Sequence, residues 1–358
     1  MEVGILGRSM SGKTTLFNLL TGSEEPTGGG GRGRSHVGVA RVPDERLLKL
    51  AALYSPRKTT PATVRYVDVP ALPDEHGREG AMNLAELRTM DALMVVLRDF
   101  ASSEIPHPEG SVDPVRDLAH IEEEFLLQDQ MVVERRLERL ARDLARRKAP
   151  ELLAEQRVLE RCLTVLEEER PLREAGLEDE ELRLLRGFTF LSLKPMLVVV
   201  NLDEDSVGSD PFDQERWASW KDRPGLGFTA VCATLEGELA HMEGPDAEEL
   251  MAGLGIADRA LDRVIHESYR LLGLVSFFTV GEDECRAWSI REGTPAVEAA
   301  GVIHSDIQRG FIRAEVVRWD ELLDAGSMAA CRQRGTLRLE GKTYPVRDGD
   351  VVHFRFNV

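Results

Sequence analysis

A glycine-rich stretch near the start of the chain, residues 7–14, has the spacing G-x-x-x-x-G-K-[ST]. An apolar run precedes it at 3–6 and apolar residues at helical spacing follow it, so a strand, a tight loop and a helix are expected. The backbone N–H groups of such a loop point at phosphate oxygens, and the helix adds its positive N-terminal end. The stretch predicts a phosphate-binding loop for a nucleoside triphosphate; the alternative is a Gly-rich turn before an ordinary helix.

Within this loop, Lys13 is expected to reach the β- and γ-phosphates as a catalytic residue, and the Thr14 hydroxyl is expected to bind Mg²⁺. A second ligand for Mg²⁺ should end a neighbouring strand, and Asp68 closes the apolar run that begins at Val64. The alternative role of Asp68 is that of a turn former. The predicted phosphate-side contacts are Gly7, Ser9, Met10, Ser11, Gly12, Lys13, Thr14 and Thr15.

Two residues after this second strand depart from the D-x-x-G pattern of GTPase-like switches. Ala71 stands where the glycine N–H would contact the γ-phosphate, and alanine keeps the N–H but restricts the backbone. Leu72 stands where a glutamine would orient the attacking water, and leucine cannot form a hydrogen bond to water. We therefore expect weaker γ-phosphate sensing and a different catalytic group.

The residues that would contact the base follow later strands. Asn201 to Glu204 come directly after the apolar run 196–200, where GTPases carry N-K-x-D. Leu202 replaces the lysine and Glu204 is one methylene longer than aspartate, so selectivity for guanine should fall and ATP is favoured. Backbone N–H groups after the run 229–232 could complete the pocket. The predicted base-side contacts are Asn201, Leu202, Glu204, Cys232, Ala233 and Thr234.

Length and composition narrow the class of protein. A chain of 358 residues is expected to form two or three domains. Apolar runs such as 196–200 are far too short to cross a membrane, and four scattered cysteines without C-x-x-C pairing indicate thiols in a reducing cytoplasm. A net charge of −18 argues against non-specific binding to DNA or RNA, although a local basic patch could still dock on a ribonucleoprotein, and we expect no sequence-specific DNA binding.

Strand-like runs at 3–6, 64–69, 93–97, 196–200 and 229–232 alternate with helical patterns, which predicts an α/β fold with a mostly parallel sheet, as in G-domain-like P-loop NTPases. We assign 1–114 and 187–274 to this nucleotide-binding domain. Residues 115–186 are rich in Glu, Arg and Leu, with two apolar seams separated by Pro150. They predict an inserted, coiled-coil-like helical arm, which contacts a partner or packs only on itself.

The last part of the chain, residues 275–358, changes to short strands at 276–280, 316–319 and 351–356, with one helix near 295–303. This order of elements predicts a separate α+β domain.

Together these motifs resemble the YchF / Obg-like ATPase family over nearly the whole chain. Beside the phosphate-binding loop and Asn201 with Glu204, the resemblance is carried by residues 37–39, 42–44, 61–63, 286–288, 299–304, 310–312 and 348–358. It implies that 275–358 is a TGS domain with a β-grasp-like fold. The chain departs from the family at Ala71, and before Val37 only Ser35 offers a hydroxyl where a threonine would close on Mg²⁺.

The resemblance also implies what this protein does. It implies that a monomer binds ATP with Mg²⁺, with K⁺ as a further candidate ion, and associates with the large ribosomal subunit or the assembled ribosome. It further implies that His107 orients or deprotonates the attacking water, the alternative being a surface histidine in a Pro-rich turn. The leading hypothesis is a slow ATPase, yielding ADP and phosphate, that acts as a ribosome-associated regulatory switch. The alternatives are a nucleotide-responsive binding protein with little or no hydrolysis, a GTP-preferring protein and a small-molecule kinase.

Overall fold

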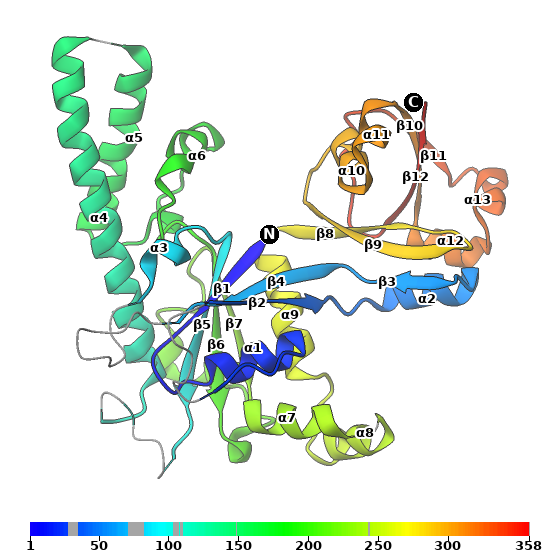
Figure 1. The fold of residues 1–358 in the computed structure, drawn as a ribbon, viewed down its shortest axis with the longest axis horizontal. Coiled ribbons are helices and arrows are strands. Elements are labelled where there is room, and N and C mark those ends of the chain that lie inside the picture. The colour runs from blue at the N-terminus through cyan, green and yellow to red at the C-terminus, as the bar shows by residue number, and fades with distance from the viewer. Residues whose placement is uncertain are drawn as a thin grey trace. The chain divides into compact units, whose positions relative to one another are not determined.

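The computed structural model describes residues 1–27, 35–70, 82–102, 107, 110–147, 149–242 and 244–357. Its contacts divide the chain into two compact units (Figure 1). The first unit holds Met1–Gly38 and Arg65–Glu267, and the second holds Val39–Val64 and Ser268–Val358. The chain thus leaves the first unit after its first helix, returns in its fourth strand, and leaves again near residue 267.

The sheet of the first unit has the strand order β2-β4-β1-β5-β6-β7. The pairs β1–β4, β1–β5, β5–β6 and β6–β7 are all parallel, so the predicted α/β fold with a mostly parallel sheet is confirmed. Because β1 lies inside the sheet, the loop after it opens at the edge where the carboxyl ends of its neighbours meet. The strands are β1 (Glu2–Leu6), β2 (His36–Arg41), β4 (Thr63–Asp68), β5 (Ala92–Asp99), β6 (Met196–Leu202) and β7 (Leu226–Val231).

The core of the first unit explains the apolar runs in its sequence. β5 and β6 are buried on both faces, which requires near-continuous apolar side chains. Val95 and Val198 pack in one cluster with Phe125 of α4 and with Trp217. The helices are α1 (Lys13–Thr21), α3 (Leu84–Leu87), α4 (Pro114–Arg146), α5 (Pro150–Glu167), α6 (Asp179–Leu185), α7 (Ala233–His241), α8 (Gly244–Gly253) and α9 (Ala260–Leu271), with the 3₁₀ helices η1 (Leu172–Glu174), η2 (Arg186–Phe188), η3 (Glu204–Ser206), η4 (Pro211–Asp213) and η5 (Glu215–Trp217).

Helices α4 and α5 form a hairpin, here called the arm, that projects from the sheet (Figure 1). The arm starts where the Asp113 side chain accepts a hydrogen bond from the Arg116 N–H and Pro114 fixes the first turn. Pro150 opens α5 in the same way, because a proline is tolerated in the first helical turn. Val133, Leu140 and Leu159 are buried in a cluster shared by the two helices.

The second unit is built around a sheet with the order β11-β10-β12-β8-β9-β3. Its pairs β10–β11, β10–β12 and β8–β9 are antiparallel, whereas β12–β8 and β3–β9 are parallel. Its elements are α2 (Glu45–Tyr54), β3 (Lys58–Thr60), β8 (Leu274–Thr279), β9 (Glu284–Arg291), α10 (Ala296–Ile303), α11 (Ser305–Arg309), β10 (Phe311–Arg318), α12 (Trp319–Ala325), α13 (Met328–Arg334), β11 (Arg338–Glu340) and β12 (Asp350–Phe356).

The boundary of the second unit differs from the predicted 275–358 because Val39–Val64 belongs to it. β3 adds a parallel edge to β9 with Lys58 opposite Glu284 and Thr60 opposite Arg286. Arg46 of α2 forms an ion pair with Asp348. A three-residue strand has no periodicity of its own, so these pairings are visible only in the folded chain.

Candidate functional site

The glycine-rich loop joins β1 to α1 and holds two glycines that the fold requires. Gly7 has φ 150° and Gly12 has φ 94°, backbone conformations that favour glycine. A Cβ at Gly7 would come 2.3 Å from the Val96 carbonyl oxygen, and one at Gly12 would come 2.3 Å from the Asn201 amide nitrogen. The loop is therefore fixed by close backbone packing against β5 and β6.

The N-terminus of α1 is suited to an anion. Gly12 caps the helix without a side-chain hydrogen bond, and the described first turn has no acidic residue. The first N–H groups of a helix have no partner within it, so they point outward together with the positive end of the helix dipole. The buried Ser11 Oγ likewise has no hydrogen-bond partner among the described residues. These donors fit a phosphate group.

Lys13 is held at the mouth of the loop by the loop itself. Its Nζ donates to the carbonyl oxygens of Gly7, at 2.9 Å, and Arg8, at 2.8 Å. The ammonium group is thus placed by the same backbone that would surround a phosphate. Thr14 and Thr15 follow in the first turn of α1, and Ser9 and Met10 lie in the loop, with Met10 exposed.

Thr14 and Asp68 lie together, as predicted for Mg²⁺ ligands. The Thr14 hydroxyl donates to Asp68 Oδ2 at 2.8 Å, across from α1 to the end of β4. Burial raises the pKa of Asp68 above its usual range, and its Oδ1 has no hydrogen-bond partner among the described residues. A hydroxyl and a carboxylate are oxygen ligands of the kind that Mg²⁺ prefers, so this pair fits the ion. No cluster of three or more His, Cys, Asp or Glu in the described part of the chain could hold a metal alone.

The Asn201 side chain joins two separate parts of the site through hydrogen bonds. Its Nδ2 donates to the Ser11 carbonyl at 3.1 Å, and its Oδ1 accepts from the Ala233 N–H at 3.1 Å. One buried amide thus fastens the phosphate-binding loop to the turn between β7 and α7. The Ala233 N–H was predicted to contact the base. In this structure it donates instead to the Asn201 side chain.

The other predicted base contacts divide into buried and exposed residues. The Leu202 side chain is buried in the core of the first unit, so only its backbone can face a ligand. Cys232 is also buried, and burial raises the pKa of its thiol. Glu204 and Thr234 are exposed, one at the start of η3 and one in the first turn of α7.

His107 faces the base of the arm. Its Nε2 lies 3.1 Å from Oδ2 of Asp117, and its side chain is only 4% exposed. Asp117 also pairs with Arg116 at 2.9 Å and lies 3.5 Å from Nε of Arg8 in the phosphate-binding loop. Arg8 in turn contacts His120 Nδ1 at 2.8 Å. These side chains link the loop, His107 and the first turns of α4.

Sequence reasoning did not identify Arg8, Asp117 or His120. Asp113 and Pro114 give the signal that could have found Asp117, because they mark a helix start four residues before it. Arg8 carries no such signal, since it fills a variable position of the loop motif.

Of the two sequence departures from the switch motifs, only the one at Ser35 lies among the described residues. Ala71 and Leu72 lie outside the described residues. Ser35 is described, and its hydroxyl donates to Oε2 of Glu86 at 2.5 Å. Asn83 donates to the same carboxylate. Ser35 is therefore engaged within the protein in this structure.

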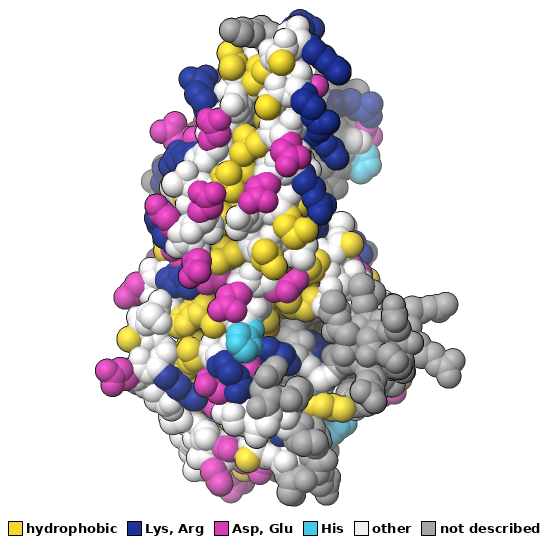
Figure 2. Space-filling view, turned by 90° about the vertical axis from the view of Figure 1, so that its left-hand side faces the viewer, with side chains coloured by type: hydrophobic (Ala, Val, Ile, Leu, Met, Phe, Trp, Pro, Cys, Tyr) yellow, Lys and Arg dark blue, Asp and Glu magenta, His cyan; other side chains and the backbone are white. Residues whose placement is uncertain are grey.

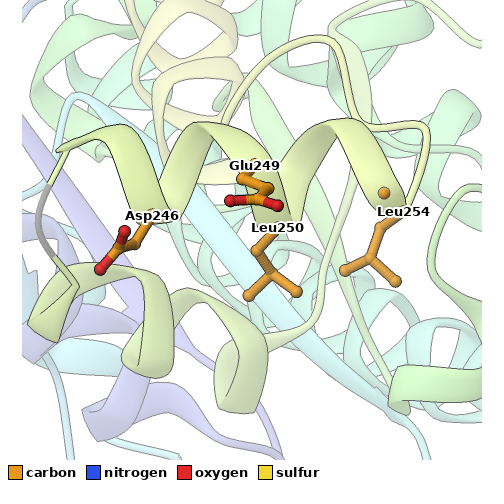
Figure 3. A pocket seen from close by; sticks show the side chains of 5 residues that line it. Asp246, Glu249, Leu250 and Leu254 are labelled. Atoms are coloured by element: carbon orange, nitrogen blue, oxygen red, sulfur yellow. The ribbon is translucent and has the colours of Figure 1, made fainter.

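Two further features lie apart from these residues. An open pocket of about 520 Å³ is lined from α8 and its end by Asp246, Glu249, Leu250, Gly253 and Leu254, and shares no residue with the site (Figure 3). Among the described helices, none is long and apolar enough to cross a membrane.

Fold and site together define a P-loop nucleoside-triphosphate-binding protein of the G-domain type. Over 100% of both chains, the protein is 39% identical to the Bacillus subtilis protein named ribosome-binding ATPase YchF. It is 34% identical to Obg-like ATPase 1 of Caenorhabditis elegans, over 100% of this chain and 92% of that one. The chain therefore belongs to the YchF / Obg-like ATPase family.

The comparison with solved structures supports the same family. The structure of the Schizosaccharomyces pombe YchF GTPase matches with a TM-score of 0.86 and 30% identity, over 99% of this chain and 97% of that one. A GTP-binding protein from Pyrococcus horikoshii matches at a TM-score of 0.61 and 18% identity, over 100% of both chains, and so shows a shared fold alone. Residues 274–357 match a family model described as a protein of unknown function, DUF933.

Proposed function

We propose that this protein binds ATP in the loop between β1 and α1, hydrolyses it slowly to ADP and phosphate, and associates with ribosomes. The observation that carries the proposal is the meeting of Lys13, Thr14 and Asp68 at the open N-terminus of α1. Relatives of similar length are named ribosome-binding ATPases, which supports both the reaction and the partner.

The placement of the residues supports the role proposed for each. Lys13 and the N–H groups of α1 bind the phosphates, and Thr14 and Asp68 would hold Mg²⁺, which would supply positive charge to neutralise the phosphates. His107 orients the attacking water, and Asp117 holds the imidazole by its Nε2. To orient the water, His107 must turn from its buried position beside Asp117 towards the phosphates.

ATP is favoured over GTP by the chemistry at the end of β6. Recognition of guanine needs a carboxylate that accepts two hydrogen bonds from one edge of the base. Leu202 is buried and supplies no such group, and the longer Glu204 lies in η3. Titration calorimetry of ATP and of GTP, each with Mg²⁺, tests this preference. Tighter binding of ATP supports the proposal; tighter binding of GTP would overturn the assignment of the base, and binding of neither would overturn the whole proposal.

A second function, nucleotide-responsive binding with little hydrolysis, is favoured by one observation. His107 is 4% exposed and paired with Asp117, so in this conformation its imidazole does not meet solvent water. Single-turnover ATP hydrolysis, measured with and without purified ribosomes, separates the two functions. A rate that rises with ribosomes supports a ribosome-associated switch, and no hydrolysis in either case supports the binding protein. Sedimentation of the protein with ribosomes tests the partner directly.

A further inference from the structure

Arg8 lies on the rim of the phosphate-binding loop beside Lys13. It follows Gly7 directly, and its carbonyl oxygen accepts a hydrogen bond from Lys13 Nζ at 2.8 Å. Its side chain is 29% exposed and leads from the loop to the first turns of α4. Figure 2 shows basic side chains and a histidine together on the surface at the base of the arm, the region in which α4 begins. The loop therefore carries a second cationic side chain next to the one proposed to contact the β- and γ-phosphates.

Two groups of α4 contact the Arg8 side chain in this structure. Its Nη2 lies 2.8 Å from His120 Nδ1, and its Nε lies 3.5 Å from Asp117 Oδ1. An imidazole nitrogen that accepts a hydrogen bond carries no negative charge. The 3.5 Å distance to Asp117 exceeds the value of about 2.7–2.9 Å that is typical of a charge-assisted hydrogen bond. Because phosphate oxygens bind a guanidinium more strongly than either of these contacts, Arg8 can exchange them for a phosphate group.

Asp117 keeps a partner when Arg8 turns away from it. The Asp117 side chain is 2% exposed, and a buried carboxylate needs hydrogen bonds and a countercharge. Arg116 donates to Asp117 Oδ1 from Nε at 3.1 Å and from Nη2 at 2.9 Å. His107 Nε2 lies 3.1 Å from Asp117 Oδ2. Because Arg116 pairs with Asp117 independently of Arg8, the movement of Arg8 leaves the buried carboxylate with its countercharge.

We propose that Arg8 turns from α4 to the γ-phosphate of bound ATP and thereby distinguishes ATP from ADP. The inference rests on the proposed binding of ATP in this loop. Ala71 stands where a glycine of a GTPase-like switch would contact the γ-phosphate, so a contact from the loop would strengthen a recognition that Ala71 is expected to weaken. A guanidinium forms two parallel hydrogen bonds to phosphate oxygens, and an arginine in such a position assists phosphoryl transfer in other NTPases.

The test compares the affinity for ADP with that for AMP-PNP, an ATP analogue that resists hydrolysis, by titration calorimetry with Mg²⁺. The full-length parent is compared with Arg8→Gln, which removes the charge, and with Arg8→Lys, which keeps the charge without the planar guanidinium. Arg116→Gln is the matched control, because it removes the other arginine from Asp117 but lies on α4, outside the loop. Circular dichroism and thermal unfolding check that all three variants fold.

The parent should bind AMP-PNP more tightly than ADP. We expect Arg8→Gln to lose about tenfold or more in AMP-PNP affinity, because a hydrogen bond to a charged group is lost, and to bind ADP as the parent does. Arg8→Lys should recover part of this loss, and Arg116→Gln should keep the parent's ratio of the two affinities. The inference is overturned by equal binding of both nucleotides to the parent, by an unchanged ratio in Arg8→Gln, by no recovery in Arg8→Lys, or by an equal loss in Arg116→Gln.

Single-turnover hydrolysis of ATP is read separately. If the parent prefers AMP-PNP through Arg8 but does not hydrolyse ATP, the proposed ATPase activity fails while the γ-phosphate contact stands. If the parent hydrolyses ATP and Arg8→Gln keeps the parent's ratio of affinities, the activity stands and Arg8 does not contact the γ-phosphate. Binding of neither nucleotide by the parent would overturn both proposals.

Discussion

At the scale of single residues, Asn201 changes how the nucleotide site is understood. It was predicted as a base contact, but it fastens the loop carbonyl of Ser11 to the N–H of Ala233. The close approach of its amide to Gly12 is also what makes a glycine necessary there. One buried amide therefore joins the loop predicted to bind phosphate to the turn predicted to contact the base.

Lys13 gives the most direct prediction. We expect Lys13→Ala to weaken ATP binding about 100-fold, because a charge-assisted hydrogen bond to phosphate contributes about 1.5–3 kcal/mol. Calorimetric titration with Mg²⁺–ATP measures the change. Lys49→Ala, which removes an exposed lysine from α2, serves as the control and should bind as the parent does. Unchanged ATP affinity in Lys13→Ala would place the phosphates elsewhere.

The raised pKa of Asp68 leads us to predict that the stability of the protein depends on pH. Burial raises its pKa, so the ionised form is disfavoured in the folded state, and this group destabilises the fold as pH rises through the raised pKa. Asp68→Asn removes that penalty. Without Mg²⁺ at pH 7 the variant should be more stable than the parent, because asparagine carries no charge in the buried position.

The same variant should lose the extra stability that Mg²⁺–ATP gives to the parent. Thermal unfolding from pH 3 to pH 8, with and without Mg²⁺–ATP, measures both effects. Asp205→Asn, in the exposed part of η3, controls for the change in charge. A variant that is less stable than the parent at pH 7 would contradict the conclusion that the ionised form of Asp68 is disfavoured in the folded state.

His107 predicts a change in rate without a change in affinity. We expect His107→Ala to slow single-turnover ATP hydrolysis about 100-fold or more, the usual contribution of a general acid or base. The dissociation constant for Mg²⁺–ATP should stay the same, because His107 contacts Asp117 of α4. His353→Ala, on an exposed position of β12, is the matched control. An unchanged rate in His107→Ala would remove His107 from the mechanism.

At the scale of elements, we predict that the buried apolar seam between α4 and α5 stabilises the arm. Leu140 is 0% exposed and Leu127, on the same helix, is 55% exposed. Leu140→Ala should destabilise the protein by about 2–5 kcal/mol through lost burial and a cavity, and Leu127→Ala by far less. Urea unfolding followed by circular dichroism measures the difference. Similar losses in the two variants would contradict the seam.

The elements were largely predictable because their signals are local. The strands β1, β4, β5, β6 and β7 follow the predicted apolar runs, and α4 and α5 begin near a capping aspartate and a proline. The strands β2 and β3 were not predicted, and nor were β9 and β11 of the second unit. β2 has exposed and buried residues in a short edge strand, and β3 has only three residues, so neither gives a strong pattern.

At the scale of the whole molecule, the second unit depends on a segment far away in the chain. Leu47 and Leu50 of α2 are buried, and β3 pairs with β9. Residues 268–358 alone should therefore be less stable than the same residues joined by a linker to 39–64. Each buried leucine contributes about 1.5–3 kcal/mol, so the difference should be large in thermal unfolding. Equal unfolding temperatures would contradict the composite unit.

The sequence by itself determined the features that depend on short spacing: the phosphate-binding loop with Lys13, the central parallel strands and the amphipathic arm. These follow from backbone geometry and periodic burial within one segment. Only the tertiary structure decided that Asn201 fastens the loop and that His107 faces Asp117 near Arg8. It also decided that Val39–Val64 joins the second unit. Each of these joins residues distant in the chain, and such contacts form only when separate elements pack together.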